Sequence, residues 1–131
     1  MKAILKTVFL SGLLAFGGSD AFAATWRLHL LQVDDIADVY INGVKKFTCT
    51  YTQKSCTFDL TTSMLIGANT IRLDLTNISS TGGYVLGYVL AKDADTYDSF
   101  VCGIYNVIGC YNSDLNAPTG PVWSHSWVVT K

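Results

Sequence analysis

Three side chains near the C-terminus have the types and the spacing of a ligand-binding surface. Trp123, His125 and Trp127 alternate with serines, so on a β-strand all three point to the same face. Aromatic rings of this kind stack against sugar rings, and an imidazole beside them can hydrogen-bond a hydroxyl group. The alternative is that the row fills a core, as large aromatic side chains usually do. We expect Trp127 to lie in the core and favour Trp123 and His125 as ligand candidates, Trp123 first because it adjoins a loop.

The stretch DADTYD, residues 93–98, gathers several oxygen donors in one segment. The carboxylates of Asp93, Asp95 and Asp98 could together hold a calcium ion, since calcium prefers hard oxygen ligands. The EF-hand pattern, with its Gly and its terminal Glu, is absent, so a solvated acidic loop is the simpler interpretation. Tyr97 in the same stretch is a further candidate for ligand binding. Apart from a structural calcium, the sequence implies no cofactor.

Catalysis finds little support in the sequence. His29 and His125 are the two histidines of the chain, and neither belongs to a nucleophile motif such as G-x-S-x-G. Pairs of carboxylates for glycoside hydrolysis could be drawn from the many Asp residues, but their spacing selects no pair. A glycine motif that would cradle a phosphate is also absent. We therefore expect a protein that is not an enzyme.

The N-terminal residues 1–23 have the pattern of a secretory signal peptide. A basic start precedes an apolar run over residues 7–18, and small residues stand at the cleavage point. Residues 24–131 then have the size of one domain. No later stretch approaches the roughly 20 apolar residues that a membrane span needs. The sequence therefore predicts a secreted or periplasmic protein, in which Asn77-Ile78-Ser79 matches a glycosylation sequon.

The composition favours β-strands and excludes some partners. All 10 acidic residues are Asp, and Thr, Val, Tyr and Gly are abundant, which disfavours helices and favours strands joined by turns. Beyond residue 23 the net charge is near −2 and the basic residues form no cluster. Nucleic acid and anionic membranes are therefore poor partners.

The 4 cysteines are Cys49, Cys56, Cys102 and Cys110. An even number in an exported protein indicates disulfides, and this number allows three connectivities. We favour the two local pairs, Cys49 with Cys56 and Cys102 with Cys110, because each pair brackets a short turn-like segment. A zinc site is the competing interpretation, but the spacings match no standard zinc motif.

Alternating hydrophobicity predicts a series of short strands. The clearest expected strands cover residues 26–33, 71–75, 84–91 and 123–130. Residues 84–91 are apolar on both faces, which predicts a central strand. Asn42-Gly43 between alternating hydrophobic residues predicts a type I′ hairpin turn. From residue 92 to residue 121 the alternation fails, and we expect a long loop.

The order of these segments resembles that of the galactose-binding-like jelly-roll domain. Asp34-Asp35 is followed by DVYINGV, then by FDLTTSMLIGANTIRLDLTN, GGYVLGYVL and SHSWVVTK. The resemblance runs from about residue 26 to residue 127, with residues 92–121 as an addition. It implies an all-β fold, an antiparallel two-sheet β-sandwich of jelly-roll type, which often carries a structural calcium. Such domains often serve as carbohydrate-binding or adhesion modules, although fold alone does not fix function.

These observations lead to one expected function and two alternatives. We expect a secreted, non-catalytic carbohydrate-binding or adhesion module whose partner is a glycan or a cell-surface component. The alternative is a structural or interaction subunit of an extracellular assembly, which would self-associate. More distantly, the chain could be an inhibitor of a secreted hydrolase that presents residues 102–110 as a rigid loop.

Overall fold

The computed structural model describes residues 23–81, 83–101, 111–112 and 118–131. Its regular structure is almost entirely β-strand, with one short 3-10 turn, η1 (Thr61–Ser63). Nothing helical in these residues approaches the length and hydropathy that a membrane span requires. The strands are β1 (Trp26–Val33), β2 (Ile36–Ile41), β3 (Val44–Thr50), β4 (Cys56–Asp59), β5 (Ala68–Asn77), β6 (Tyr84–Lys92), β7 (Asp95–Val101), β8 (Tyr111–Asn112) and β9 (Gly120–Thr130).

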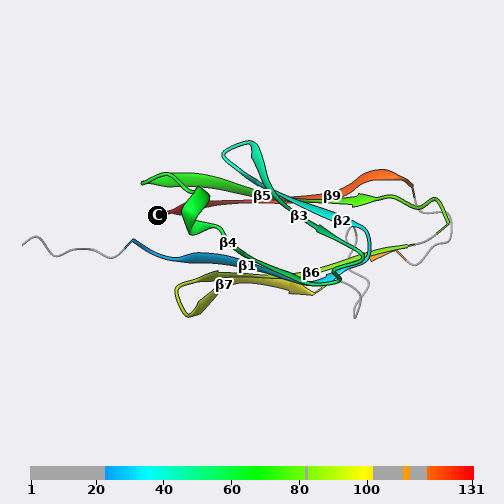
Figure 1. Ribbon diagram of the computed structural model, residues 1–131, viewed down its shortest axis with the longest axis horizontal. Helices are drawn as coiled ribbons and strands as arrows, with labels where there is room; N and C mark the ends of the chain where they lie inside the picture. Colours follow the sequence, from blue (N-terminus) through cyan, green and yellow to red (C-terminus); the bar gives the residue numbers. More distant parts are fainter. Residues whose placement is uncertain (1–22, 82, 102–110, 113–117) are drawn as a thin grey trace, which may run out of the picture.

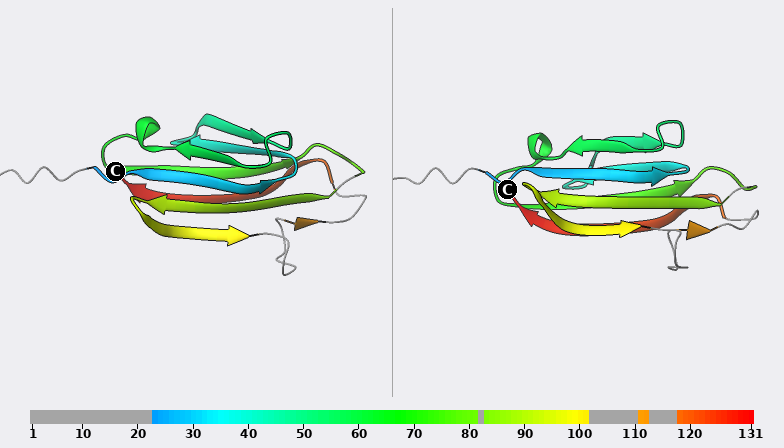
Figure 2. Two further views of the ribbon diagram at one scale, coloured as in Figure 1. Left: turned by 60° about the horizontal axis from the view of Figure 1, so that its bottom comes forward. Right: turned by 90° about the horizontal axis from the view of Figure 1, so that it is seen from below.

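The strands form two antiparallel sheets that lie face to face (Figure 1). Sheet A has the order β4-β1-β6-β7, and β8 pairs with the start of β6 beyond the end of β7 (Figure 2). Sheet B has the order β3-β2-β5-β9. The antiparallel two-sheet β-sandwich expected from the sequence is therefore confirmed, whereas the jelly-roll topology stays a prediction.

The period of two along the strands determines which residues meet between the sheets. On β5, Ile71, Leu73 and Leu75 are fully buried, while Arg72 and Asp74 are partly exposed on the opposite face. The central strand predicted over residues 84–91 is also confirmed, because β6 lies between β1 and β7. The largest fully buried apolar side chains form one core between the sheets: Trp26, Leu28, Leu30, Ile41, Leu60, Ile71, Leu73, Leu75, Leu86 and Leu90.

The Asn-Gly turn joins β2 to β3 as predicted. Asn42 and Gly43 have φ angles of 51° and 80°, the positive values that a type I′ turn requires at both central residues. The Asn42 side chain also anchors the hairpin to β5. Its Nδ2 donates to Asn69 Oδ1 at 2.8 Å, and its Oδ1 accepts from Thr70 N at 2.9 Å. The turn is therefore a structural element of the fold.

The long loop predicted over residues 92–121 is wrong in its first part, because β6 turns directly back into β7. Asp93 at the turn has a φ of 55°, a left-handed conformation that Asp tolerates better than most residues, and Asp95 pairs with Lys92. Leu90 faces Asp98 and Ala91 faces Thr96, so Tyr97 is an extra residue in β7. This β-bulge interrupts the period of two, which is why alternation along the sequence did not reveal the strand.

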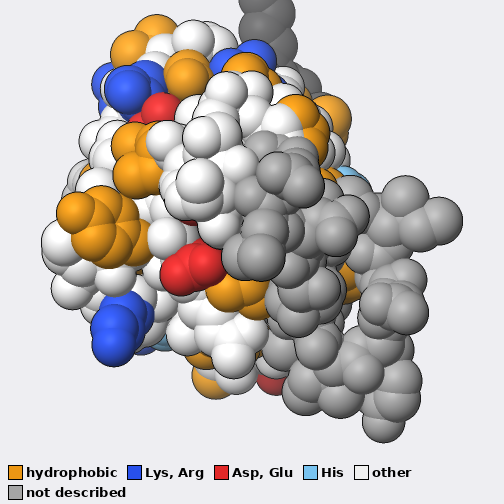
Figure 3. Space-filling view, turned by 90° about the vertical axis from the view of Figure 1, so that its right-hand side faces the viewer, with side chains coloured by type: hydrophobic (Ala, Val, Ile, Leu, Met, Phe, Trp, Pro, Cys, Tyr) orange, Lys and Arg blue, Asp and Glu red, His pale blue; other side chains and the backbone are white. Residues whose placement is uncertain are grey.

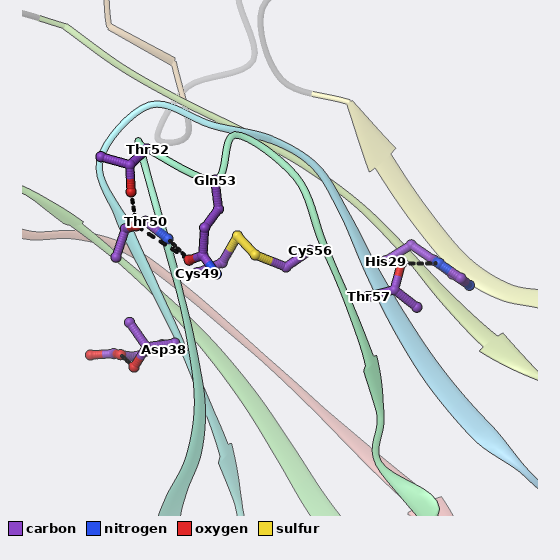
Figure 4. The surroundings of a disulfide bond; sticks show 9 residues. His29, Asp38, Cys49, Thr50, Thr52, Gln53, Cys56 and Thr57 are labelled. Atoms are coloured by element: carbon purple, nitrogen blue, oxygen red, sulfur yellow. Dashed lines mark hydrogen bonds between the residues drawn. A yellow bond between two sulfur atoms is a disulfide. The ribbon is translucent and has the colours of Figure 1, made fainter.

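The predicted Cys49–Cys56 disulfide is confirmed, and it joins the two sheets. Cys49 lies on β3 of sheet B and Cys56 on β4 of sheet A, with their Cα atoms 6.0 Å apart (Figure 4). Beside the bond, Phe47 of β3 stacks on Phe58 of β4 with ring centroids 4.8 Å apart. Because β3 and β4 are edge strands of opposite sheets, the disulfide closes one side of the sandwich.

Two further expectations concern the cysteines and the sequon. The pairing expected for Cys102 and Cys110 lies outside the described residues, as do residues 1–22. Asn77 of the sequon is 1% exposed, and its Nδ2 donates to the Pro118 carbonyl at 2.9 Å. The nitrogen to which a glycan would attach is therefore engaged inside the fold.

Replacing Cys49 and Cys56 together by Ala should lower the free energy of unfolding by about 2.5 kcal/mol, because the unfolded chain regains the freedom of the closed loop. Urea unfolding at neutral pH measures this change. Ser55→Ala, an exposed change in the same loop, is the control and should shift the value by less than about 0.5 kcal/mol. A double variant as stable as the unmodified chain would show that the bond has no stabilising role.

A buried carboxylate stands at the corner where the chain passes from β1 to β2. Asp35 is 3% exposed; its Oδ1 accepts from Ile78 N at 3.2 Å, but its Oδ2 finds no hydrogen-bond partner among the described residues. Burial raises the pKa of this carboxyl, the Ile78 bond opposes the rise, and the neighbouring Asp34 adds to it. The charged form is therefore less stable in the folded protein than in the unfolded chain.

Asp35→Asn should raise the stability of the protein at neutral pH by about 1 kcal/mol, because the neutral amide avoids burying an unpaired charge. The folded protein holds the Asp35 proton more tightly than the unfolded chain, so its stability falls as pH rises from 3.8 through the raised pKa. The advantage of the variant should accordingly vanish below pH 3.8. Urea unfolding at both pH values tests this, with Asp95→Asn, at an exposed site on β7, as the control that should change little. An Asp35 variant less stable than the unmodified chain at neutral pH would contradict the prediction.

Candidate functional site

The aromatic row on β9 passes from the core to the surface. Trp127 is 7% exposed, so the core position predicted for it is confirmed, whereas Trp123 is half-buried and the His125 side chain is 44% exposed. Trp123 and His125 are stacked with ring centroids 5.9 Å apart, and His125 meets Trp127 edge to face at 4.7 Å. The two favoured ligand candidates are therefore brought together at the more open part of one row.

Side chains of sheet A face this row from β6 and β7. The Trp123 ring lies parallel to Phe100 at 6.4 Å, and Tyr88 meets Trp127 edge to face at 5.1 Å. β7 and β9 are the edge strands of the two sheets, and they run beside each other in Figure 2. These contacts close the side of the sandwich opposite the disulfide. We call this cluster the aromatic seam and define it by Tyr88, Asp98, Phe100, Trp123, His125 and Trp127.

One carboxylate oxygen holds the aromatic seam together. Asp98 Oδ2 accepts a hydrogen bond from Trp127 Nε1 at 2.7 Å and another from Tyr88 Oη at 3.1 Å, and His125 Nε2 lies 3.8 Å away. The Trp127 bond is the main cause that lowers the pKa of Asp98. Burial and the bond to Asp98 raise the pKa of Tyr88, which therefore stays a donor. Asp98 thus connects sheet B, through Trp127, with sheet A.

A shallow depression of about 400 Å³ lies where Trp123 meets the outer face of sheet B. Arg72 Nε lies 3.1 Å from Asp74 Oδ2, at an angle that makes no hydrogen bond. Ser124 Oγ donates to Asp74 Oδ1 at 2.6 Å, and the Arg72 guanidinium lies 4.0 Å from the centre of the Tyr40 ring. The depression is lined by Arg72, Asp74, Pro121, Trp123 and Ser124.

The geometry of this depression follows from strand register. Arg72 and Asp74 are two of the outward residues of β5, and Asp74 lies directly opposite Ser124 of β9. Trp123 lies opposite the buried Leu75 and Pro121 lies opposite Thr76, with a register shift between them, so both stand at the border of the depression. The sequence analysis named Trp123 here but missed Arg72, Asp74 and Ser124. The alternation that placed Arg72 and Asp74 on the outward face was visible in the sequence, but it did not show which strand would lie beside them.

Tyr97 is not part of this arrangement. Its ring meets the buried Trp26 edge to face at 4.9 Å, at the other end of β7 from Phe100. The bulge in β7 directs Tyr97 toward Trp26, although the side chain is still 51% exposed. The structure brings together Trp123 and His125 but not Tyr97.

The structure does not bring together the three carboxylates that the sequence offered as calcium ligands. Asp93 Oδ1 accepts from the backbone and the hydroxyl of Thr25, and these bonds lower its pKa, while Asp98 points into the aromatic seam. Asp95 lies between them at the start of β7. Over the residues that the structure describes, no group of three or more His, Cys, Asp or Glu side chains could hold a metal. The hairpin separates these carboxylates because it places them on a turn and on opposite parts of a strand.

Other surfaces of the described residues offer less to a ligand. At the end of the sandwich seen in Figure 3, hydrophobic side chains are interspersed with charged and polar ones and form no single continuous patch among the described residues. A second depression of about 340 Å³ lies on the outer face of sheet A, next to Cys56 and Leu31. There His29 Nδ1 and Thr57 Oγ1 share a hydrogen bond of 3.0 Å (Figure 4). Its lining includes no carboxylate, Trp or Tyr.

The fold and the site define a disulfide-linked β-sandwich with a polar, aromatic-bordered depression on one sheet. Comparisons with protein-family models, with curated proteins and with solved structures found no match for this chain. The resemblance to the galactose-binding-like domain gains no support from them and stays a prediction.

Asp98→Asn should destabilise the protein above pH 4 by about 1 kcal/mol, a value reduced from that of a buried charged hydrogen bond because the Asp98 side chain is 38% exposed. Since the pKa of Asp98 is lowered in the folded state, its contribution is present at neutral pH and is lost as pH falls through that lowered pKa. The unfolding free energies of the Asp98→Asn variant and of the unmodified protein should therefore become equal in acid. Asp95→Asn, an exposed change on the same strand, is the matched control. Equal stabilities at neutral pH would show that Asp98 does not hold the seam.

Proposed function

We propose that this protein is an exported, non-catalytic glycan-binding or adhesion module that binds its ligand in the depression beside Trp123. The observation that supports this is the fixed Arg72–Asp74–Ser124 group in a depression bordered by Pro121 and Trp123. A sugar presents hydroxyl groups along its edge and an apolar C–H face. Asp74 accepts from hydroxyls and Arg72 donates to them, while Pro121 and Trp123 give the depression an apolar border for the C–H face.

The polar side chains are held in place before a ligand arrives. Asp74 is fixed by Ser124, and the Arg72 guanidinium rests over Tyr40, a favourable cation–π contact. Ordered side chains lose less conformational entropy on binding. A depression this open suits a ligand that binds with low affinity, such as a short glycan.

Export is supported by the disulfide and by the N-terminal pattern. A disulfide such as Cys49–Cys56 is typical of oxidising compartments, which agrees with the signal peptide predicted over residues 1–23. A ligand outside the cell, either a free glycan or a cell-surface component, fits that location.

The second candidate function, a structural or interaction subunit of an extracellular assembly, is favoured by the outer edge of β9, with which no described strand pairs. The inhibitor hypothesis rested on residues 102–110, which lie outside the described residues.

Trp123→Ala and Arg72→Gln should each weaken glycan binding about tenfold or more, because one removes the large apolar residue at the border of the depression and the other a charged donor. A screen of the secreted protein against plant, bacterial and animal glycans identifies a ligand, and calorimetry then compares the variants. Tyr51→Ala removes an aromatic ring that is 52% exposed but lies away from the depression, so it should bind like the unmodified protein. The proposal fails if the folded protein binds no glycan, or if Trp123→Ala binds as tightly as Tyr51→Ala.

A further inference from the structure

β9 is the last strand of sheet B, and no strand among the described residues pairs with its outer edge. The bonds at the end of the strand show which backbone groups point to that edge. Lys131 N donates to Gly67 O at 3.0 Å and Gly67 N donates to Lys131 O at 3.2 Å, so these two residues form a hydrogen-bonded pair. In an antiparallel ladder such pairs alternate with pairs that exchange no bonds.

The alternation leaves the backbone groups of every second residue of β9 facing away from β5. Counting back from Lys131, the residues bonded to β5 include Val129, Trp127 and His125, and the intervening residues are not bonded to it. Thr70, which lies opposite Val128, accepts instead from Asn42 N at 2.8 Å. The Thr130 carbonyl is taken by Trp26 Nε1 at 3.2 Å. We call the three residues that remain, Ser124, Ser126 and Val128, the free edge.

The free edge lacks the protection that the other edge strands carry. Natural proteins protect sheet edges with charged residues or with short strands. β3 carries the exposed Lys45 and Lys46, β4 has only 4 residues, and β7 carries Asp95 and Asp98. β9, in contrast, has 11 residues and no Asp, Glu, Lys or Arg, and Val128 is 71% exposed on it.

We propose that two copies of this chain pair along β9 in antiparallel orientation, about a twofold axis at Ser126. Ser126 then lies opposite its own copy, and Ser124 lies opposite Val128 of the second copy. Every N–H and C=O of the free edge finds a partner in this register. An axis shifted by one residue would leave part of the free edge unpaired or would require the Thr130 carbonyl, which Trp26 already occupies.

A second copy suits this edge because the outward side chains are small and the strand is uncharged apart from His125. In the same register His125 lies opposite Trp127 of the second copy, at a pair without hydrogen bonds, where side chains approach most closely. His125 is the exposed member of the aromatic seam, and this contact would stack it against a second indole. The aromatic rows of both copies would join across the axis.

The contact extends over few residues, so the association should be weak. Pairing along one strand covers less surface than the roughly 1,200 Å² at the lower limit of stable interfaces. We therefore expect monomer and dimer to exchange at concentrations of about 10 μM to 1 mM. Sedimentation velocity of the secreted protein across this range measures the dissociation constant.

Two variants of the free edge test the proposal without disturbing the pairing with β5. Ser126→Pro removes an N–H that β5 does not use, and Val128→Lys adds the charge that the edge lacks. Each should weaken dimerisation about tenfold or more. Thr70→Lys places the same charge on the same sheet face, opposite Val128 but one strand away from the edge, and should leave the dissociation constant within about twofold. Urea unfolding of each monomer confirms that the variants are folded.

The register has a test of its own. Cα atoms of a hydrogen-bonded antiparallel pair lie about 5.5 Å apart, a distance that a disulfide spans. Oxidised Ser126→Cys should therefore give a dimer cross-linked through position 126 of both chains, identified by mass spectrometry of non-reduced peptides. Val128→Cys should not cross-link, because its equivalent in the second copy lies several residues away. The proposal is overturned if the protein is strictly monomeric at 1 mM. It is also overturned if Thr70→Lys weakens the dimer as much as Val128→Lys does. Neither outcome depends on whether the protein binds glycans.

Discussion

The carboxylate oxygen Asp98 Oδ2 is the polar centre of the contact between β9 and sheet A. Two strands of one sheet and one strand of the other meet there through Tyr88, Asp98 and Trp127. A partly buried carboxylate without such donors would be unstable, so the donors and the charge stabilise each other. Trp127, His125 and Trp123 lie in ring contact along the same face, and Trp123 also borders the candidate site.

The two sides of the sandwich are closed by different means. The Cys49–Cys56 bond closes the side of β3 and β4 covalently, and its contribution does not depend on charge. The aromatic seam closes the side of β7 and β9 through hydrogen bonds to Asp98, whose strength depends on its ionisation. In acid the sandwich therefore weakens first on the side that carries the candidate site, while the disulfide side keeps its connection.

The sequence predicted those features of the fold that depend on residues close together in the chain. Alternation revealed the buried face of Ile71, Leu73 and Leu75, and Asn42-Gly43 revealed the hairpin, because each signal lies within a few residues. The sequence did not reveal β7, because a bulge breaks the period of two. It also did not show that the local disulfide joins the two sheets, because strand pairing is a property of the whole chain. The partners of Asp98 stand 10 and 29 residues away, so the sequence, which suggested a solvated acidic loop or a calcium ligand, did not reveal its role in the seam.

The two faces of β9 have opposite requirements. Its inward face must carry large aromatic rings to close the seam. Its outward face must carry small side chains if a ligand is to reach Arg72 and Asp74. Ser124 and Ser126 meet the second demand, because a Lys at either position would extend over the depression and pair with Asp74. The same small residues leave the strand edge without charge, which is the usual condition for unwanted pairing. Pairing with a second copy would cover that edge and keep the outward face open, so that both copies present their depressions on one continuous sheet. A multivalent glycan could then contact two weak sites at once and gain affinity without any new contact in either one.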